Sequence, residues 1–269
     1  MTVPANLRLT IEYDGTAFCG FQWQPDLRTI AGTLEAALTR LLGRETKITG
    51  AGRTDAGVHA TGQVVSLSTT SRFPFDRLAL AVNSLLPSDL SVRETAVVDD
   101  GFSARFSASE RTYVYAILNR NAPSALLARY AYHVPHRLDL AAMREAAAQL
   151  VGEHDFRSFA AAAGAPTVRD VRRVKIEPAG ELFRLEIAAD GFLHHMVRTI
   201  AGTLVECGLG RRRPGTLSDI LAARDRAAAG FTAPPQGLFL AGVRYDGYDS
   251  FAEPPLFGGP LERLAVPRA

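Results

Sequence analysis

One short segment of the chain, residues 48–60, combines an acid, an arginine and small residues in a pattern that can support catalysis. It reads Ile-Thr-Gly-Ala-Gly-Arg-Thr-Asp-Ala-Gly-Val-His-Ala, so Asp55 follows Arg53 by two positions. Three glycines relieve the backbone of steric limits and let it approach a ligand closely. A guanidinium beside a carboxylate favours its charged form, and a carboxylate can act as a covalent nucleophile. The segment therefore predicts an ionised acid, held by an arginine, with room for a flat substrate above it.

Two phosphate-binding motifs have similar spacing but fail in detail. The Gly-x-Gly at 50–52 could open a dinucleotide fingerprint, but the third glycine belongs at the position of Asp55, whose charge would repel a pyrophosphate. The Gly-x4-Gly at 52–57 begins like a P-loop, but Val58 and His59 follow instead of Lys and Ser or Thr. A purely structural role for Asp55, capping a turn through its own side chain, stays open.

Composition limits the class of protein. The 269 residues are 47% apolar, as is normal for a globular chain with a full core. No apolar run reaches the roughly 18–20 residues that span a bilayer, and no secretory signal opens the chain, so we expect a cytoplasmic protein without a membrane partner. The only cysteines, Cys19 and Cys207, predict neither a disulfide framework nor a zinc site. A catalytic thiol at Cys19 is disfavoured, because no clear histidine or acid partner lies near it.

Arginine dominates the basic residues, with 28 arginines against two lysines at a net charge of only +2. Codon composition explains this ratio better than function does. Placement is more informative, because the basic clusters at 169–175 and 211–213 can form a stripe that tracks phosphates, although each alone is more often a solvated face. None of the six histidines shows helical metal spacing with a third ligand, so we expect no metal site.

The elements that must position these residues follow one order twice. The first half reads as a strand at 7–13, a helix with Leu34, Leu38, Leu41 and Leu42 on one stripe, strands near 46–50 and 62–69, a helix from Asp76 to a stop at Pro87, and a strand near 90–98. The second half reads as a strand at 113–118, a helix near 139–151 with Leu150 and Val151 inward, strands at 170–177 and 182–188, helices at 192–208 and from Thr216, and a strand at 238–244.

This repeated order is the ferredoxin-like arrangement, and two copies fit the length. We therefore expect an α+β fold of two tandem ferredoxin-like or RRM-like βαββαβ halves. Their sheets are antiparallel with helices on one face, and the active-site cleft lies between the halves. The expected domains are residues 1–108 with the catalytic acid and residues 109–246, which complete the site. Residues 247–269 would form a Pro/Gly-rich C-terminal tail on the surface.

Further motifs in a fixed order extend over nearly the whole chain. Besides 48–60 they are Tyr13-Asp14-Gly15-Thr16-x-Phe18-x-Gly20-Phe21-Gln22, Phe102-x-Ala104-Arg105-Phe106-Ser107-Ala108 with Arg111-Thr112-Tyr113, Gly152-Glu153-His154-Asp155-Phe156-x-Ser158-Phe159, Phe192-Leu193-His194-His195-Met196-Val197-Arg198, and Ala233-Pro234-Pro235-Gln236-Gly237-Leu238-Phe239-Leu240. On these motifs the chain resembles the TruA family of tRNA pseudouridine synthases. Phe21 stands where tryptophan is common in that family.

The resemblance implies a reaction and its residues. The bond from ribose C1′ to uracil N1 breaks, the base turns, and C1′ joins C5. No electrons are exchanged and no atoms leave, so no cofactor is implied. Asp55 would be the nucleophile, and Tyr113 would stack on the target uracil. Whether Asp55 adds to the base, attacks C1′ or removes a sugar proton stays open.

Arg198 would be the ion-pair partner of Asp55 in this family. The apolar stripe of its helix consists of Leu193, Met196, Val197, Ile200 and Leu204, and Arg198 lies off that stripe. Arg53 would grip a phosphate or hold the place of the extruded nucleotide, and Leu238 would be an apolar lid. The remaining expected substrate contacts are Phe21, Arg105, His194 and His195.

The implied substrate is the anticodon stem-loop of tRNA at positions 38, 39 and 40, and the implied assembly is a homodimer. A uridine within a stem must be extruded at a cost of a few kcal/mol, which binding to the RNA shape offsets. The rival hypothesis is a non-catalytic RNA-binding or tRNA-folding protein of the same architecture, which fold alone does not separate from an enzyme.

Overall fold

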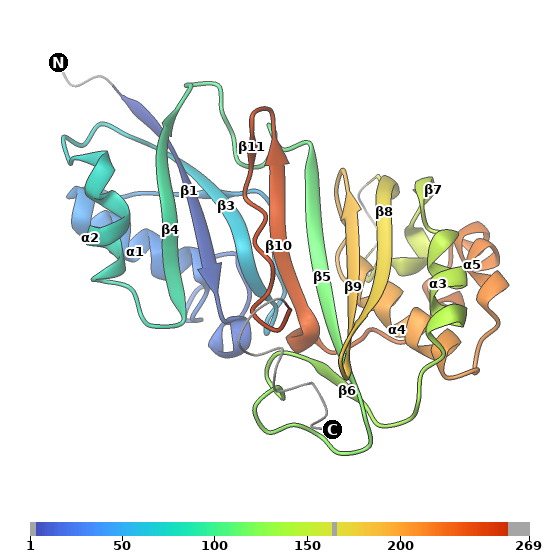
Figure 1. Cartoon of the computed structure of the whole chain (residues 1–269). Helices are drawn as coiled ribbons and strands as arrows, with labels where there is room; N and C mark the ends of the chain where they lie inside the picture. Colours follow the sequence, from blue (N-terminus) through green and yellow to red (C-terminus); the bar gives the residue numbers. More distant parts are fainter. Residues whose placement is uncertain (1–3, 163–165, 258–269) are drawn as a thin grey trace. The chain divides into compact units, whose positions relative to one another are not determined.

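The computed structural model describes residues 4–162 and 166–257, and the chain gathers into two compact units (Figure 1). The first unit takes the residues up to Arg111 together with Leu240–Ala252. The second takes the described residues of Thr112–Phe239 and those from Glu253 to Phe257. The sequence-based division places residues 240–246 in the second domain and residues 247–252 in the tail, but both stretches cluster with the first unit.

The first unit is built on antiparallel strands in the order β4-β1-β3. These strands are β1 (Ala5–Tyr13), β3 (His59–Thr69) and β4 (Leu90–Val98), and the short β2 (Thr49–Gly50) pairs with β3. Helix α1 (Ile30–Leu42) connects β1 to β2, and α2 (Leu78–Asn83) connects β3 to β4.

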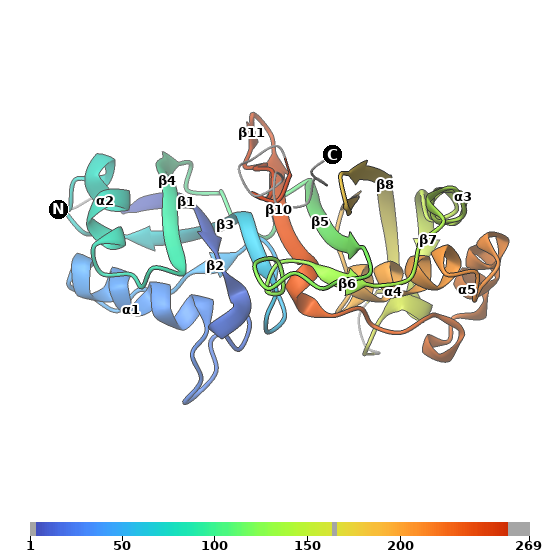
Figure 2. The same ribbon diagram turned by 60° about the horizontal axis from the view of Figure 1, so that its bottom comes forward.

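Alternation along β1 gives the first unit its core. Leu7, Leu9 and Ile11 point to one face and are fully buried. Figure 2 shows α1 lying along this sheet, and its stripe contributes the fully buried Leu34 and Leu38. Each large aliphatic side chain removed from water contributes about 1.5–3 kcal/mol, so this stripe holds α1 to the sheet.

The second unit uses the strand order β5-β9-β8-β7. Its strands are β5 (Glu110–Asn119), β6 (Tyr132–Val134), β7 (Gly152–Asp155), β8 (Val168–Ala179) and β9 (Leu182–Ala189). The hairpin β8–β9 is antiparallel, and β6 pairs with β5 in the parallel sense. Helix α3 (Leu140–Ala148) packs on α4 (Met196–Gly208), and α5 (Leu217–Ala223) follows.

Two strands carry the chain from one unit to the other. The first residues of β5 belong to the first unit, and the first residues of β10 (Leu238–Tyr245) belong to the second. The rest of β10 lies next to β3 in the strand order, and β11 (Tyr248–Asp249) pairs back on it. Short 3-10 turns occur at Gly15–Ala17, Phe75–Arg77, Arg157–Phe159, Pro214–Thr216, Arg226–Ala228 and Pro235–Gly237.

The structure confirms a mixed fold of helices and largely antiparallel sheets and corrects several details. Helix α2 ends at Asn83, four residues before Pro87, where the backbone bonds tighten and the Leu85 N–H donates to the Val82 carbonyl at 2.9 Å. The Asn83 side chain pairs with the backbone of Val92 in β4. Val151, expected to face inward, is 45% exposed, because α3 ends at Ala148. The expected surface tail buries Leu256 and Phe257, while residues 258–269 lie outside the described part. Across the ranges described, no helix has both the length and the hydropathy needed to cross a bilayer.

Candidate active site

Asp55 lies in the loop between β2 and β3, and this loop turns sharply just after it. The N–H of Val58 donates to the carbonyl of Asp55 at 3.2 Å, and Gly57 has a φ of 77°, which glycine adopts without strain. The Asp55 side chain is half-buried, whereas Arg53 is exposed. The loop therefore presents a carboxylate at the boundary between protein and solvent.

The entry to this loop is fixed through backbone groups. The N–H of Ala51 donates to the Val64 carbonyl at 2.8 Å, and the Gln63 amide donates to the Gly52 carbonyl, also at 2.8 Å. The Arg111 guanidinium donates twice to the Ala51 carbonyl, from Nε at 3.3 Å and from Nη2 at 3.1 Å. A loop held at successive residues has little freedom to move the carboxylate that it carries.

Thr54, the residue directly before Asp55, is held from two sides. Its carbonyl accepts from the Phe21 N–H at 3.0 Å, and its hydroxyl lies 2.8 Å from the Tyr13 hydroxyl. Burial raises the pKa of Tyr13 to about 12, although hydrogen bonds with Thr54 and Gln63 oppose the rise. Tyr13 is therefore a neutral phenol at any physiological pH, and its bond to Thr54 does not titrate.

The opening segment 14–21 packs under the exit of the loop. The Gly15 N–H donates to Nδ1 of the buried His59 at 3.0 Å. A Cβ on Gly15 would lie 2.0 Å from the Val58 carbonyl oxygen, and a Cβ on Gly20 would lie 3.0 Å from the Thr54 carbonyl oxygen. Only glycine allows the two segments to approach this closely.

Phe21, an expected substrate contact, is only 5% exposed. Its ring lies beneath Gly50, where an added Cβ would come within 2.5 Å of the ring carbon Cζ. This burial favours a supporting role under the Asp55 loop, and the substrate contact stays a prediction. Arg105, also in the first unit, is exposed, as expected of a residue that meets a substrate.

In the second unit, α4 holds Arg198 as the sequence pattern requires. Met196, Val197, Ile200 and Leu204 are buried on the core stripe, and Arg198, off that stripe, is half-buried.

The Arg198 Nε–H donates to the Ala233 carbonyl at 2.8 Å, and the Ala233 N–H donates back to the Arg198 carbonyl at 3.0 Å. A Cβ on Gly202 would lie 1.9 Å from the Phe231 carbonyl oxygen, so the glycine lets segment 231–233 lie against the helix. The guanidinium is therefore held against this segment through its Nε.

Helix α4 starts at Met196 and not at residue 192, because His195 takes a left-handed conformation with a φ of 64°. Such a conformation is costly for a residue with a side chain. The exposed His194 lies against His195, with ring centroids 3.9 Å apart. The His194 carbonyl accepts from the Ala161 N–H at 3.0 Å, which helps to hold this strained turn.

Tyr113 and Leu238, the expected neighbours of the uracil, are mostly buried in the second unit. Tyr113 on β5 is 7% exposed and meets Phe192 edge to face, with ring centroids 5.0 Å apart. Leu238, at the start of β10, is 5% exposed. The expected site residues are thus distributed over both units: Arg53, Asp55, Phe21 and Arg105 in the first, and Tyr113, Arg198, Leu238, His194 and His195 in the second.

Comparison of the chain with known proteins identifies its family. The family model described as tRNA pseudouridine synthase matches residues 9–107 and 146–246. Over 242 residues the chain is 43% identical to tRNA pseudouridine synthase A of Caldicellulosiruptor bescii, which covers 89% of this chain and 99% of that protein. The proteins of that name from Moorella thermoacetica and Bacillus subtilis are 46% and 43% identical over 244 residues, with the same coverage.

The chain belongs to the tRNA pseudouridine synthase family. The family predicted from the ordered motifs is therefore confirmed, and with it the class of enzyme, an isomerase. Among solved structures, an archaeal box H/ACA complex of Nop10 and Cbf5 aligns with 75% of this chain and 42% of that chain, at 15% identity. The TM-score of 0.33 is too low to establish a common fold.

In this pseudouridine synthase, four residues that immobilise the loop were not among the candidates predicted from the sequence: Tyr13, Thr54, Gln63 and Arg111. Three of them stand inside the quoted motifs, which was the available signal. Their functions were not evident because each makes its contact with a partner more than ten residues away along the chain.

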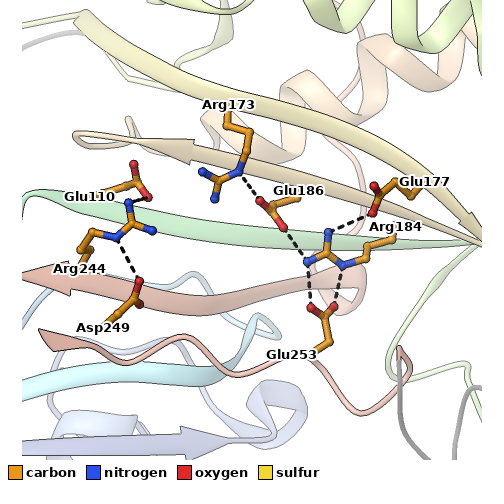
Figure 3. Close-up of polar contacts among 8 residues, drawn as sticks. All are labelled: Glu110, Arg173, Glu177, Arg184, Glu186, Arg244, Asp249 and Glu253. Carbon is orange, nitrogen blue, oxygen red and sulfur yellow. Dashed lines mark hydrogen bonds and ion pairs between the residues drawn. The ribbon is translucent and has the colours of Figure 1, made fainter.

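The basic cluster on β8 is partly neutralised within the second unit. Arg173 donates to Glu186 at 2.5 Å, and Arg184 bridges Glu186 and Glu253, each at 2.6 Å, as Figure 3 shows. Burial alone would raise the pKa of Glu186, but the hydrogen bonds from Arg173 and Arg184 outweigh it and lower the pKa. The charge of Arg173 is therefore already paired with a carboxylate of the same unit. The more exposed members of the two clusters are the better candidates for phosphate contact.

Proposed function

We propose that this protein converts uridine to pseudouridine in tRNA, with Asp55 as the nucleophile, Arg198 as its ion-pair partner and Tyr113 stacked on the extruded uracil. Family membership supports the reaction. The observation that carries the role of Asp55 is the fixation of its loop, in which hydrogen bonds hold the backbone before and after a half-buried carboxylate. Such fixation is what a nucleophile needs, because a misplaced attacking atom loses most of its effective concentration.

The chemistry balances without any added reagent. The C1′–N1 bond breaks, the base turns, and a C1′–C5 bond forms. The proton on C5 leaves to solvent and N1 gains one, so the atoms of the nucleotide are conserved. Asp55 bonds transiently to the substrate or takes a sugar proton, and either role requires it to be ionised. A fixed guanidinium from Arg198 would stabilise that charge.

The substrate we propose is the anticodon stem-loop, at positions 38, 39 and 40. Because one acid must serve three adjacent positions, the enzyme must recognise the RNA by its shape and flexibility and not by the identity of its bases. The exposed guanidinium of Arg53, two residues before Asp55, is suited to a phosphate next to the target. A tRNA substrate also favours a cytoplasmic location.

We further propose that each half is a ferredoxin-like unit, with the site completed between them, and that the enzyme works as a homodimer. In the first unit, the order β4-β1-β3 with β2 paired to β3 supports this topology. The homodimer rests on the family resemblance, and sedimentation of the purified protein tests it, because a monomer at all concentrations would exclude it.

Release of tritium from C5 of uracil tests the catalytic assignment. Unmodified tRNA carrying tritium at C5 is incubated with wild type, Asp55→Asn, Asp55→Ala and the control Asp100→Asn, whose carboxylate is exposed in the same unit. We expect release by wild type and Asp100→Asn and none by either Asp55 variant. Normal tritium release by the Asp55 variants would refute the assignment of Asp55 as the nucleophile. If wild type binds tRNA but releases no tritium, the non-catalytic RNA-binding hypothesis is favoured.

A further inference from the structure

Phe106 is the most exposed large apolar side chain among the residues that the structure describes, at 82%. The guanidinium of Arg105 lies beside it, 5.4 Å from the ring centroid. A single exposed aromatic residue is not unusual in itself. What distinguishes Phe106 is the rigidity of the turn that carries it and the place where this turn is attached.

The turn is anchored on both sides of Phe106. The Ala104 N–H donates to the Ser66 hydroxyl at 3.0 Å, and the Tyr245 hydroxyl donates to the Ala104 carbonyl at 2.7 Å. Ala104 itself is fully buried. Ser103 and Ser107 bond to each other across the turn twice, each time at 3.0 Å. The backbone is therefore fixed while the ring of Phe106 stands in solvent.

The attachment point is the guanidinium that also holds the catalytic loop. Arg111 Nη2 donates to the Arg105 carbonyl at 2.6 Å and to the Ala51 carbonyl at 3.1 Å. Its Nη1 donates to the Ala108 carbonyl at 3.1 Å. One nitrogen atom thus joins the turn of Phe106 to the loop of Asp55, and both lie in the first unit.

We propose that Phe106, flanked by Arg105, is a stacking platform for a base of the RNA substrate close to the uridine that is isomerised. An aromatic face stacks on any base, and an adjacent guanidinium adds a cation–π contact or a phosphate contact. The platform suits an enzyme that must extrude one nucleotide, because stacking on a neighbouring base stabilises the opened RNA. This inference rests on the proposed function and adds a binding residue to it.

The test compares Phe106→Ala, Phe106→Leu and Phe106→Trp with the control Leu80→Ala, whose side chain is 80% exposed in the same unit. Binding of an unmodified tRNA transcript is measured by fluorescence anisotropy over a range of salt, and tritium release gives kcat and KM. Base–aromatic stacking is worth roughly 1–3 kcal/mol, so we expect Phe106→Ala to weaken binding about 5- to 140-fold. Phe106→Trp should restore binding, Phe106→Leu should not, and Leu80→Ala should match wild type. The salt slope should be unchanged in Phe106→Ala, because no phosphate contact is lost.

Three results would overturn the platform. These are wild-type binding and kinetics in Phe106→Ala, equal rescue by leucine and tryptophan, or a change of oligomeric state in Phe106→Ala, which would mean that a second copy of the chain covers the ring. If wild type forms no pseudouridine while Phe106→Ala still weakens tRNA binding, the proposed function fails and the platform stands. Urea midpoints equal to wild type confirm that each variant is folded.

Discussion

Replacing Gly15 by alanine should damage catalysis although Gly15 touches no substrate in our account. The new Cβ would lie 2.0 Å from the Val58 carbonyl oxygen and 2.6 Å from its carbon. Both are backbone atoms, so no flexible side chain can yield, and Val58 must retreat by about 1 Å to reach even the tightest tolerated contact of 3.0 Å. Because the Val58 N–H is bonded to the Asp55 carbonyl, this shift passes to the residue that we assign as nucleophile.

A misplacement of about 1 Å costs on the order of 100-fold in rate, and overpacking costs roughly 1–3 kcal/mol of stability. We therefore expect Gly15→Ala to lower kcat about 100-fold while remaining folded. The matched control is Gly101→Ala in the same unit, where an added Cβ meets nothing within 4 Å. Tritium release gives kcat, and urea unfolding gives stability. If Gly15→Ala keeps the kcat of Gly101→Ala, the loop does not hold Asp55 in the way that we describe.

Further predictions concern the supporting groups. Tyr13→Phe leaves the Thr54 hydroxyl without its tyrosine partner, so this variant should lower the free energy of unfolding by about 1–3 kcal/mol. It should also lower kcat by a factor that does not vary with pH. An unchanged urea midpoint would contradict this prediction. The pKa of Glu186 in the folded protein lies below its ordinary 4.5, so the contribution of this carboxylate to stability is present above about pH 4.5 and is lost as pH falls through the folded value. Glu186→Gln should therefore flatten the acid side of the plot of unfolding free energy against pH. An acid side identical to that of wild type would be evidence against the pairing of Glu186 with Arg173 and Arg184. Burial raises the pKa of Cys207 to about 11, so iodoacetamide at pH 8 should label only the exposed Cys19 in the folded protein. Cys19→Ala should remain active. Labelling of Cys207 in the folded protein would contradict the prediction.

The sequence predicted the elements with strong periodicity, because periodicity reports directly which face is buried. The stripe of Leu34 and Leu38 in α1 and the buried Met196, Val197, Ile200 and Leu204 of α4 lie where the pattern places them. Leu193, expected on the same stripe, precedes α4 and is only half-buried. The ends of the elements were harder to predict. Helix α2 stops early at Asn83, whose amide pairs with β4, and the period of the helix carries no sign of that contact.

The candidate site likewise includes residues that the sequence reveals and residues that only the folded structure reveals. Asp55 stands out in the sequence because small residues surround it and nothing else in the segment can do its chemistry. The anchors Tyr13, Gln63 and Arg111 do not stand out, because each acts through a contact that only folding creates. The close approach of Gly15 to Val58 is likewise visible only in three dimensions, since a glycine in a loop has many possible reasons.

The most direct test of the central claim maps pseudouridine at single-nucleotide resolution in an unmodified tRNA transcript after incubation with wild type or Asp55→Ala. Our account predicts modified uridines in the anticodon stem-loop with wild type and none with Asp55→Ala, although that variant still binds the transcript. Pseudouridine at the same positions with Asp55→Ala would show that another group forms the bond and would contradict the account.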